Sequence, residues 1–176
     1  EADFFTKNIR IKDGKMIFDV SCSNYIKQIN DNKIKKDIVL HMPGMHNVSN
    51  SIASAGVCFY LGLSLTDIAN GLDTFQGINR RFDQHINTEK LVYIDDYAHH
   101  PDEVSATIDT TKKLYPSREL IVVFQPHLFS RTKILAHEFA LSLQQADDLV
   151  LLDVYPAREK PIHGVSSNML LKLCNN

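Results

Sequence analysis

The sequence has few of the features that mark secreted, membrane-spanning or metal-binding chains. Its three cysteines, Cys22, Cys58 and Cys174, are scattered and odd in number, and they fit neither a disulfide framework nor a CxxC metal spacing. No apolar run approaches the length of a transmembrane helix, and no signal peptide is recognisable. The 19 lysines and arginines nearly balance the 21 acids, so neither nucleic acid nor a membrane is an expected partner. These absences favour a reducing cytoplasm.

Three sequence motifs of common enzyme classes are also missing. There is no P-loop of the form GxxxxGK[ST], no GxSxG nucleophile motif, and no Gly-rich turn of a dinucleotide-binding domain. The hydrophobic content of 44% is ordinary for a globular protein. A length of 176 residues suits one domain and part of another. Because the chain opens without methionine, we expect it to be a piece of a longer protein.

The first part of the chain predicts a hairpin, a strand and two helices. Asp13 and Gly14 join two runs of alternating polarity, and these residues suit the positive φ angles of a tight hairpin turn. A strand is expected at 36–42 and a helix at 47–63, followed by a shorter helix with Thr66 as its N-cap. The apolar face of the longer helix is formed by Val48, Ile52, Ala55 and Phe59.

The second part predicts alternating strands and helices. Strands are expected at 90–96, 119–125 and 147–154, separated by helices at 101–115 and 131–146. This order is typical of a parallel sheet with right-handed crossovers, and the continuous apolar strands indicate burial on both faces. The predicted fold class is therefore α/β. A Rossmann-like parallel or mixed sheet flanked by helices follows a β-hairpin and its helices.

Polar residues gather in the three segments that leave these strands, "DDYAHHP", "QPHLFSRT" and "DVYPARE". In a parallel sheet such loops share one edge, where ligands bind. The expected rim consists of Asp95, Asp96, His99, His100, His127, Arg131, Arg158 and Glu159. A metal site is disfavoured because adjacent histidines diverge and two arginines repel a cation. Arginines and histidines beside acids instead favour binding of anions and of ribose hydroxyls.

Five ordered motifs, "GMHNVSN", "GINRRFD", "IDDYAHHPDEV", "VFQPHLFSRT" and "DVYPARE", resemble the ATP-dependent Mur ligases. The resemblance is strongest to members that join L-alanine to UDP-N-acetylmuramate in peptidoglycan synthesis. It implies that residues 1–76 are the C-terminal part of the central ATP-binding domain. Residues 77–176 would then be the C-terminal, amino-acid-binding domain, which is expected to be shortened because relatives continue into a further strand.

The chemistry implied by the resemblance is amide formation through an acyl phosphate. ATP phosphorylates the muramate carboxylate, and the amine of L-alanine attacks it inside a closed, water-excluding site. The implied ligands are ATP, UDP-N-acetylmuramate and L-alanine, with Mg²⁺ held mainly by a part of the central domain that this chain lacks. The piece itself is expected to be inactive. Two alternatives remain open, a murein-tripeptide recycling ligase of the same family and a non-catalytic nucleotide- or amino-acid-binding module.

For the nucleotide, the resemblance implies contacts from two segments of the first part and one of the second. Asn47 and Asn50 match the positions that contact adenine, with His46 beside them; helix capping is the alternative role for such an Asn. Arg80 and Arg81 match a hinge arginine that faces the phosphates, although a solvated linker would look the same. Asp96 matches a ribose-binding aspartate, while Asp95 is expected only to end the strand.

For the amino acid, the resemblance implies Tyr97, His99, His127 and Arg131. Arg131 would hold the substrate carboxylate, Tyr97 would wall the pocket, and His99 is the candidate catalytic base by position. Leu128 replaces an arginine of many relatives, which leaves open whether a second cation assists. His100 has two readings, as a site residue or as the cap of the following helix. For Arg158 and Glu159, a salt bridge on the rim is the alternative to a role in the site.

Overall fold

The structure is a computed structural model that describes residues 3–23 and 34–174. Contacts between residues divide the chain into two compact units, Glu1–Asp95 and Asp96–Asn176, and each is described by itself. The α/β class predicted from the sequence is confirmed, since both units combine strands with helices. None of the helices in the described ranges is long and apolar enough to cross a membrane.

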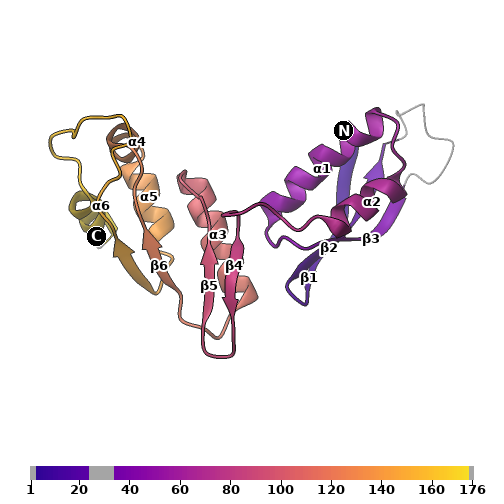
Figure 1. Cartoon of the computed structure of the whole chain (residues 1–176), viewed down its shortest axis with the longest axis horizontal. Helices are drawn as coiled ribbons and strands as arrows, with labels where there is room; N and C mark the ends of the chain where they lie inside the picture. The colour runs from indigo at the N-terminus through magenta and orange to yellow at the C-terminus, as the bar shows by residue number, and fades with distance from the viewer. Residues whose placement is uncertain (1–2, 24–33, 175–176) are drawn as a thin grey trace. The chain divides into compact units, whose positions relative to one another are not determined.

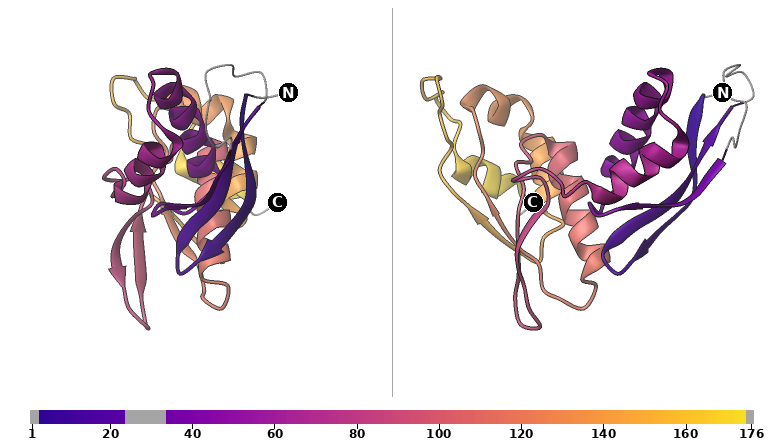
Figure 2. Two further views of the ribbon diagram at one scale, coloured as in Figure 1. Left: turned by 90° about the vertical axis from the view of Figure 1, so that its right-hand side faces the viewer. Right: turned by 45° about the vertical axis from the view of Figure 1, so that its right-hand side comes forward.

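The first unit opens with an antiparallel sheet covered on one face by two helices (Figures 1 and 2). Strands β1 (Phe4–Lys12), β2 (Lys15–Cys22) and β3 (Ile34–Leu40) follow the order β1-β2-β3. The predicted turn is confirmed, because Asp13 and Gly14 both have positive φ, 50° and 74°. Helices α1 (Met45–Tyr60) and α2 (Leu65–Thr74) cover the sheet. The predicted apolar face of α1 is also confirmed, with Val48 and Ala55 buried in the shared core.

One N-cap lies elsewhere than the sequence predicted. Helix α2 begins at Leu65, and the hydroxyl of Ser64 accepts the Asp67 N–H at 3.1 Å. The predicted cap, Thr66, is instead the second residue of the helix. Both hydroxyl residues suit an N-cap, so the choice depends on where the turn after α1 places the first helical residue.

A buried carboxylate joins all three strands of this sheet. Asp19 on β2 is only 7% exposed, and it accepts bonds from the Asn8 side chain on β1 at 2.8 Å and from the Asp37 N–H on β3 at 2.9 Å. The Asp37 N–H and the Asn8 amide hold the pKa of Asp19 below its ordinary value. Both strand pairings shift register around this residue. Asp19 therefore accepts hydrogen bonds from donors, such as the Asp37 N–H, that the irregular strand pairing does not satisfy.

The first unit ends in a two-stranded antiparallel hairpin. Strand β4 (Asp83–Asn87) pairs with β5 (Val92–Asp95), the first strand predicted for the second part of the chain. The predicted parallel pairing holds for the other two strands, β6 (Ile121–Phe124) and β7 (Asp148–Leu151), which lie in the second unit.

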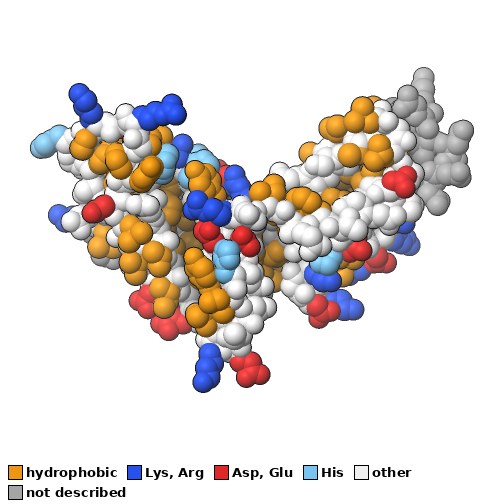
Figure 3. Space-filling model, in the orientation of Figure 1, with side chains coloured by type: hydrophobic (Ala, Val, Ile, Leu, Met, Phe, Trp, Pro, Cys, Tyr) orange, Lys and Arg blue, Asp and Glu red, His pale blue; other side chains and the backbone are white. Residues whose placement is uncertain are grey.

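The helices of the second unit pack against one face of the β6–β7 pair (Figure 1). Helices α3 (Pro101–Leu114), α5 (Ala136–Leu143) and α6 (Ser167–Cys174) share one apolar cluster with the two strands. The other face stays exposed, as the hydrophobic side chains over these strands in Figure 3 show. Ile121 is 59% and Val123 63% exposed. The prediction that these strands are buried on both faces is therefore wrong for the described chain.

The single helix predicted at 131–146 is also wrong. The structure has two helices there, α4 (Phe129–Ile134) and α5, separated at Leu135, which has φ −104° and ψ 23°. Phe139 and Leu143 are fully buried as their spacing predicted. The break places α4 next to the end of β6 while α5 follows the core. Sequence periodicity cannot distinguish this arrangement from one continuous helix.

Candidate functional site

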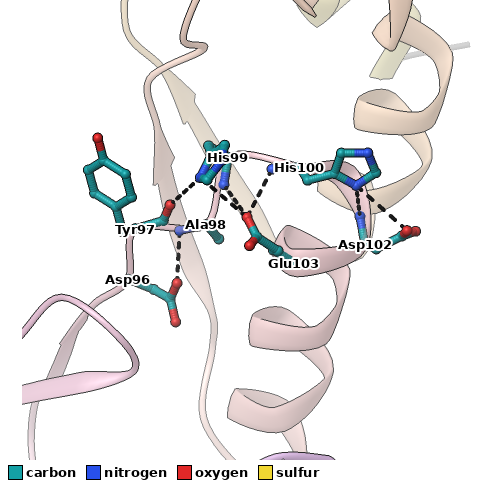
Figure 4. Close-up of polar contacts among 7 residues, drawn as sticks. All are labelled: Asp96, Tyr97, Ala98, His99, His100, Asp102 and Glu103. Carbon is teal, nitrogen blue, oxygen red and sulfur yellow. Dashed lines mark hydrogen bonds and ion pairs between the residues drawn. The ribbon is translucent and has the colours of Figure 1, made fainter. Parts of the chain in front are cut away.

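The segment after β5 is ordered by two carboxylates (Figure 4). Asp96 is half-buried, and its Oδ1 accepts the Ala98 N–H at 2.8 Å, which closes a short turn. Glu103, in the first turn of α3, reaches back and accepts the N–H groups of His99 at 3.0 Å and of His100 at 3.2 Å. Two adjacent backbone donors therefore share one carboxylate oxygen, and the histidine pair is held in a defined conformation.

The His99 ring is oriented through its Nδ1 atom. Nδ1 lies 2.9 Å from the carbonyl oxygen of Tyr97 and 3.3 Å from Glu103 Oε2. Both neighbours only accept hydrogen bonds, so Nδ1 carries the proton and Nε2 keeps its lone pair in the neutral ring. The Tyr97 ring meets the imidazole edge-on, with centroids 5.6 Å apart. This arrangement provides one proton acceptor on a half-buried side chain.

The His100 side chain is a helix cap. Its Nδ1 accepts the Asp102 N–H at 3.4 Å, and together with Glu103 it forms a capping box at the start of α3. Pro101 occupies the first helical position, as the sequence indicated. Of the two readings of His100, the structure bears out the cap, and the two neighbouring imidazoles have different surroundings (Figure 4).

The segments after β6 and β7 continue side by side beyond the strands. The Tyr155 N–H donates to Pro126 O at 2.8 Å, and the Leu128 N–H donates to Tyr155 O at 2.9 Å. His127 forms an isolated parallel bridge with Tyr155, and their rings stack with centroids 5.4 Å apart. The structure therefore confirms that these two loops meet. His127 is paired with Tyr155 of the neighbouring loop through both the backbone and the ring. Figure 1 shows that α3 and α4 begin at the same end of the unit.

Glu159 bonds to Ser130 at the start of α4, a partner that neither reading of this residue from the sequence included. Its two carboxylate oxygens accept the Ser130 N–H at 2.8 Å and the Ser130 hydroxyl. The Ser130 hydroxyl and N–H, helped by the Phe129 N–H and the Arg131 charge, lower the pKa of Glu159. Arg131 is the residue after Ser130 on the six-residue helix α4, and it is half-buried. Sequence inspection found Glu159 but not its partner.

The candidate nucleotide residues of the first unit lie at the start of α1. His46 and Asn50 are exposed, whereas Asn47 is buried and donates its Nδ2 hydrogen to Pro43 O at 2.7 Å. The N-cap of this helix is Gly44, at φ 109°. Helix capping by Asn47, the alternative weighed from the sequence, is therefore wrong. Its side chain instead fastens the helix to the preceding Pro-Gly turn.

Arg80 is engaged within its own unit. Its Nε donates to Asp95 Oδ2 at 3.1 Å, and its backbone N–H donates to Asp83 at 3.2 Å. Asp95 therefore does more than end β5, which the sequence did not indicate. Arg81 follows in a turn in which its N–H donates to Ile78 O at 3.1 Å. The ion pair fixes one arginine of the "NRRF" motif against the end of a strand.

Metal-binding geometry is not found in the described parts of the chain. No three His, Cys, Asp or Glu side chains of residues 3–23 and 34–174 gather as a group that could hold an ion. His99 and His127 lie in different loops, each with a separate partner, Glu103 and Tyr155. The described residues therefore do not form a cluster of three or more such ligands, which a metal site built from protein side chains alone would need.

The features above define an α/β protein with polar side chains in the loops that follow β5, β6 and β7. Loops that follow parallel strands such as β6 and β7 are the usual binding edge of this architecture. A profile of the Mur ligase, glutamate ligase domain matches residues 80–174. The chain belongs to the Mur ligase family.

Several relatives match nearly the whole chain. A UDP-N-acetylmuramate–L-alanine ligase of Flavobacterium psychrophilum is 44% identical over 176 residues, which are 100% of this chain and 38% of that protein. The ligase of the same name from Parabacteroides distasonis is 43% identical over 169 residues, 96% of this chain and 35% of the relative. The chain thus spans just over a third of the length of these relatives.

Solved structures of the same kind are similar in fold. A UDP-N-acetylmuramate–alanine ligase from Thermotoga maritima superposes with a TM-score of 0.76 and 25% identity, over 99% of this chain and 35% of that one. A murein peptide ligase from Psychrobacter arcticus gives a TM-score of 0.56 and 26% identity, over 85% of this chain and 30% of that one. The expected resemblance to Mur ligases is confirmed.

Proposed function

We propose that this chain is part of an ATP-dependent ligase that joins L-alanine to UDP-N-acetylmuramate during bacterial peptidoglycan synthesis. The observation that supports this most is similarity along the full chain to ligases of that name, at 44% identity in one case. We further propose that residues 1–76 belong to the central, ATP-binding domain and 77–176 to the C-terminal domain. A cytoplasmic location follows from the proposed substrates. By itself, a piece without a P-loop is expected to be inactive.

We propose that His99 and Arg131 act on the amino acid. His99 Nε2 keeps a lone pair because Nδ1 faces Tyr97 O and Glu103, so Nε2 is suited to accept a proton or hydrogen bond from the alanine ammonium group. The Arg131 guanidinium is a planar fork that matches a carboxylate. We propose that His127 and Tyr97 line the same pocket, His127 being held by its stack on Tyr155. The deprotonated amine of alanine would then attack the carbonyl carbon of the acyl phosphate, forming the amide bond as the bond to phosphate breaks and inorganic phosphate leaves.

We propose nucleotide-binding roles for five side chains of the first unit and for Asp96 of the second. The amides of Asn47 and Asn50, with His46, suit the edge of adenine, and Arg80 and Arg81 suit phosphate oxygens. Asp96 offers its carboxylate to ribose hydroxyls, since Oδ1 is already oriented by the Ala98 N–H. We propose that Mg²⁺ bound with ATP is held mainly by a part of the central domain that this chain lacks, together with the phosphates.

The test uses the full-length protein that contains this chain. Phosphate release from ATP is followed with UDP-N-acetylmuramate and either L-alanine or the murein tripeptide. Release that depends on L-alanine supports the proposal. Release that depends on the tripeptide would assign the chain to the recycling ligases, a candidate favoured by the likeness to the murein peptide ligase. If the folded protein releases no phosphate with either amine, a non-catalytic binding module would be favoured.

Arg131 is the residue on which the substrate assignment is tested most directly. Arg131→Ala should raise the KM for L-alanine at least tenfold, because removing one partner of a charged pair in a closed site costs about 2–4 kcal/mol. The KM for ATP should change little. Lys133→Ala, on the same short helix and exposed, is the matched control. Equal alanine KM values in the two variants would contradict the assignment.

A further inference from the structure

The first turn of α4 lacks a cap from its own segment. Its N-cap residue, Leu128, has no side chain that can accept a hydrogen bond, and no cap bond is formed locally. The first N–H groups of any helix need acceptors from elsewhere. A six-residue helix is too short to be stable without them, since isolated helices of this length are marginal in water.

Glu159 supplies the missing acceptors from the loop after β7. One carboxylate oxygen accepts the Ser130 N–H at 2.8 Å, and the other accepts the Ser130 hydroxyl. The Glu159 N–H donates to Pro156 O at 2.9 Å, so a turn in its own loop holds the carboxylate in place. Glu159 is therefore an N-cap that comes from a distant part of the same chain. Its negative charge also suits the positive end of the helix.

The capped turn carries the side chains proposed to bind the amino acid. Arg131 directly follows Ser130, and His127 lies three residues before Ser130. His127 is also paired with Tyr155, which belongs to the same loop as Glu159. When the first turn of a helix frays, the directions of its side chains are lost with it. The position of Arg131 therefore depends on a carboxylate located 28 residues further along the chain.

We infer that Glu159 is a positioning residue for the amino-acid pocket. It acts as an N-cap from a distant loop of the same chain and fixes the turn that carries Arg131. This inference rests on the proposed function for its substrate and on the geometry above for the cap. Both carboxylate oxygens of Glu159 are already bonded to α4. Its effect on substrate accordingly passes through Arg131, and it does not itself bind the amino acid.

The test compares two substitutions in the full-length protein with a matched control. Glu159→Ala removes both acceptors and should raise the KM for L-alanine by about three- to tenfold, with the KM for ATP unchanged. Glu159→Gln keeps one oxygen acceptor and should recover part of this loss. Glu138→Ala, on the exposed side of α5 in the same unit, should behave as wild type.

A second readout reports the cap without substrate. In the 176-residue chain, the Ser130 amide should exchange with solvent at least several-fold faster in Glu159→Ala than in Glu138→Ala. Unchanged exchange would disprove the cap. Faster exchange with an unchanged KM for alanine would show a merely structural role, even if the Tm were lowered, and would overturn the inference. A lowered KM for alanine would overturn it too. If the wild-type protein shows no alanine-dependent turnover, the proposed function fails and the pocket role fails with it, while the exchange rate still decides the cap.

Discussion

Leu128 provides a sharp test of the backbone geometry at the candidate site. Its φ of 71° and ψ of 130° lie where residues with a Cβ are rarely found. Its N–H bonds Tyr155 O at 2.9 Å and its carbonyl accepts the Thr132 hydroxyl at 2.8 Å, so the neighbouring loop and α4 hold this conformation from both sides. Backbone strain of this kind costs about 1–3 kcal/mol and is common at functional sites.

We expect Leu128→Gly to be more stable than Leu128→Ala. Both variants lose the leucine side chain, so their difference isolates the backbone. Glycine avoids the strain but loses about 0.4–1 kcal/mol through its freer unfolded chain. The net advantage of glycine in the free energy of unfolding should be about 1 kcal/mol. Urea unfolding, followed through resolved amide signals of β6 for the second unit, measures this difference.

The matched control is an ordinary helical position. At Glu138 on α5 the order should reverse, with glycine about 1 kcal/mol less stable than alanine. If alanine equals or exceeds glycine at position 128 as well, the backbone at Leu128 is not strained.

Two further predictions concern stability. Ser64→Ala should destabilise the first unit by about 1 kcal/mol whereas Thr66→Ala should have a smaller effect, because only Ser64 caps α2; urea unfolding decides, and the reverse order would restore Thr66 as the cap. In the second unit, the Leu120 N–H and Lys112 hold the pKa of Asp147 below its ordinary value, so its stabilisation is complete above the unfolded-state pKa of about 3.9 and is lost as pH falls through the folded-state pKa. Asp147→Asn should flatten this part of the acid dependence of Tm, and an unchanged profile would contradict the role.

Local sequence rules were sufficient where one segment contains the whole cause. The turn at Asp13-Gly14 is set by its own φ angles, and α3 is set by Pro101 and the acids of its first turn. The periodic apolar face of α1 belongs to the same class. These elements appear at the expected positions because no distant partner competes with the local preference.

The same rules failed where distant residues decide the structure. A continuous helix at 131–146 satisfies the periodicity, yet the chain breaks at Leu135. The exposed face of β6 and β7 likewise depends on which side the helices pack. The spacing does not encode the break, because Phe139 and Leu143 keep the same register in one continuous helix or in two. It also does not encode which face of the strands the helices cover.

For the candidate site, the sequence alone determined the chemical inventory. It identified the histidines, Asp96 and Arg131 after the strands, and their resemblance to a ligase family, since residue types and their order survive without coordinates. Only the tertiary structure decided the partners that are distant in sequence, which are Tyr155 for His127 and Glu159 for Ser130. The physical reason is that hydrogen bonds act over about 3 Å in space, whatever the separation along the chain. The role of a polar side chain is therefore fixed by the segment that folding brings beside it.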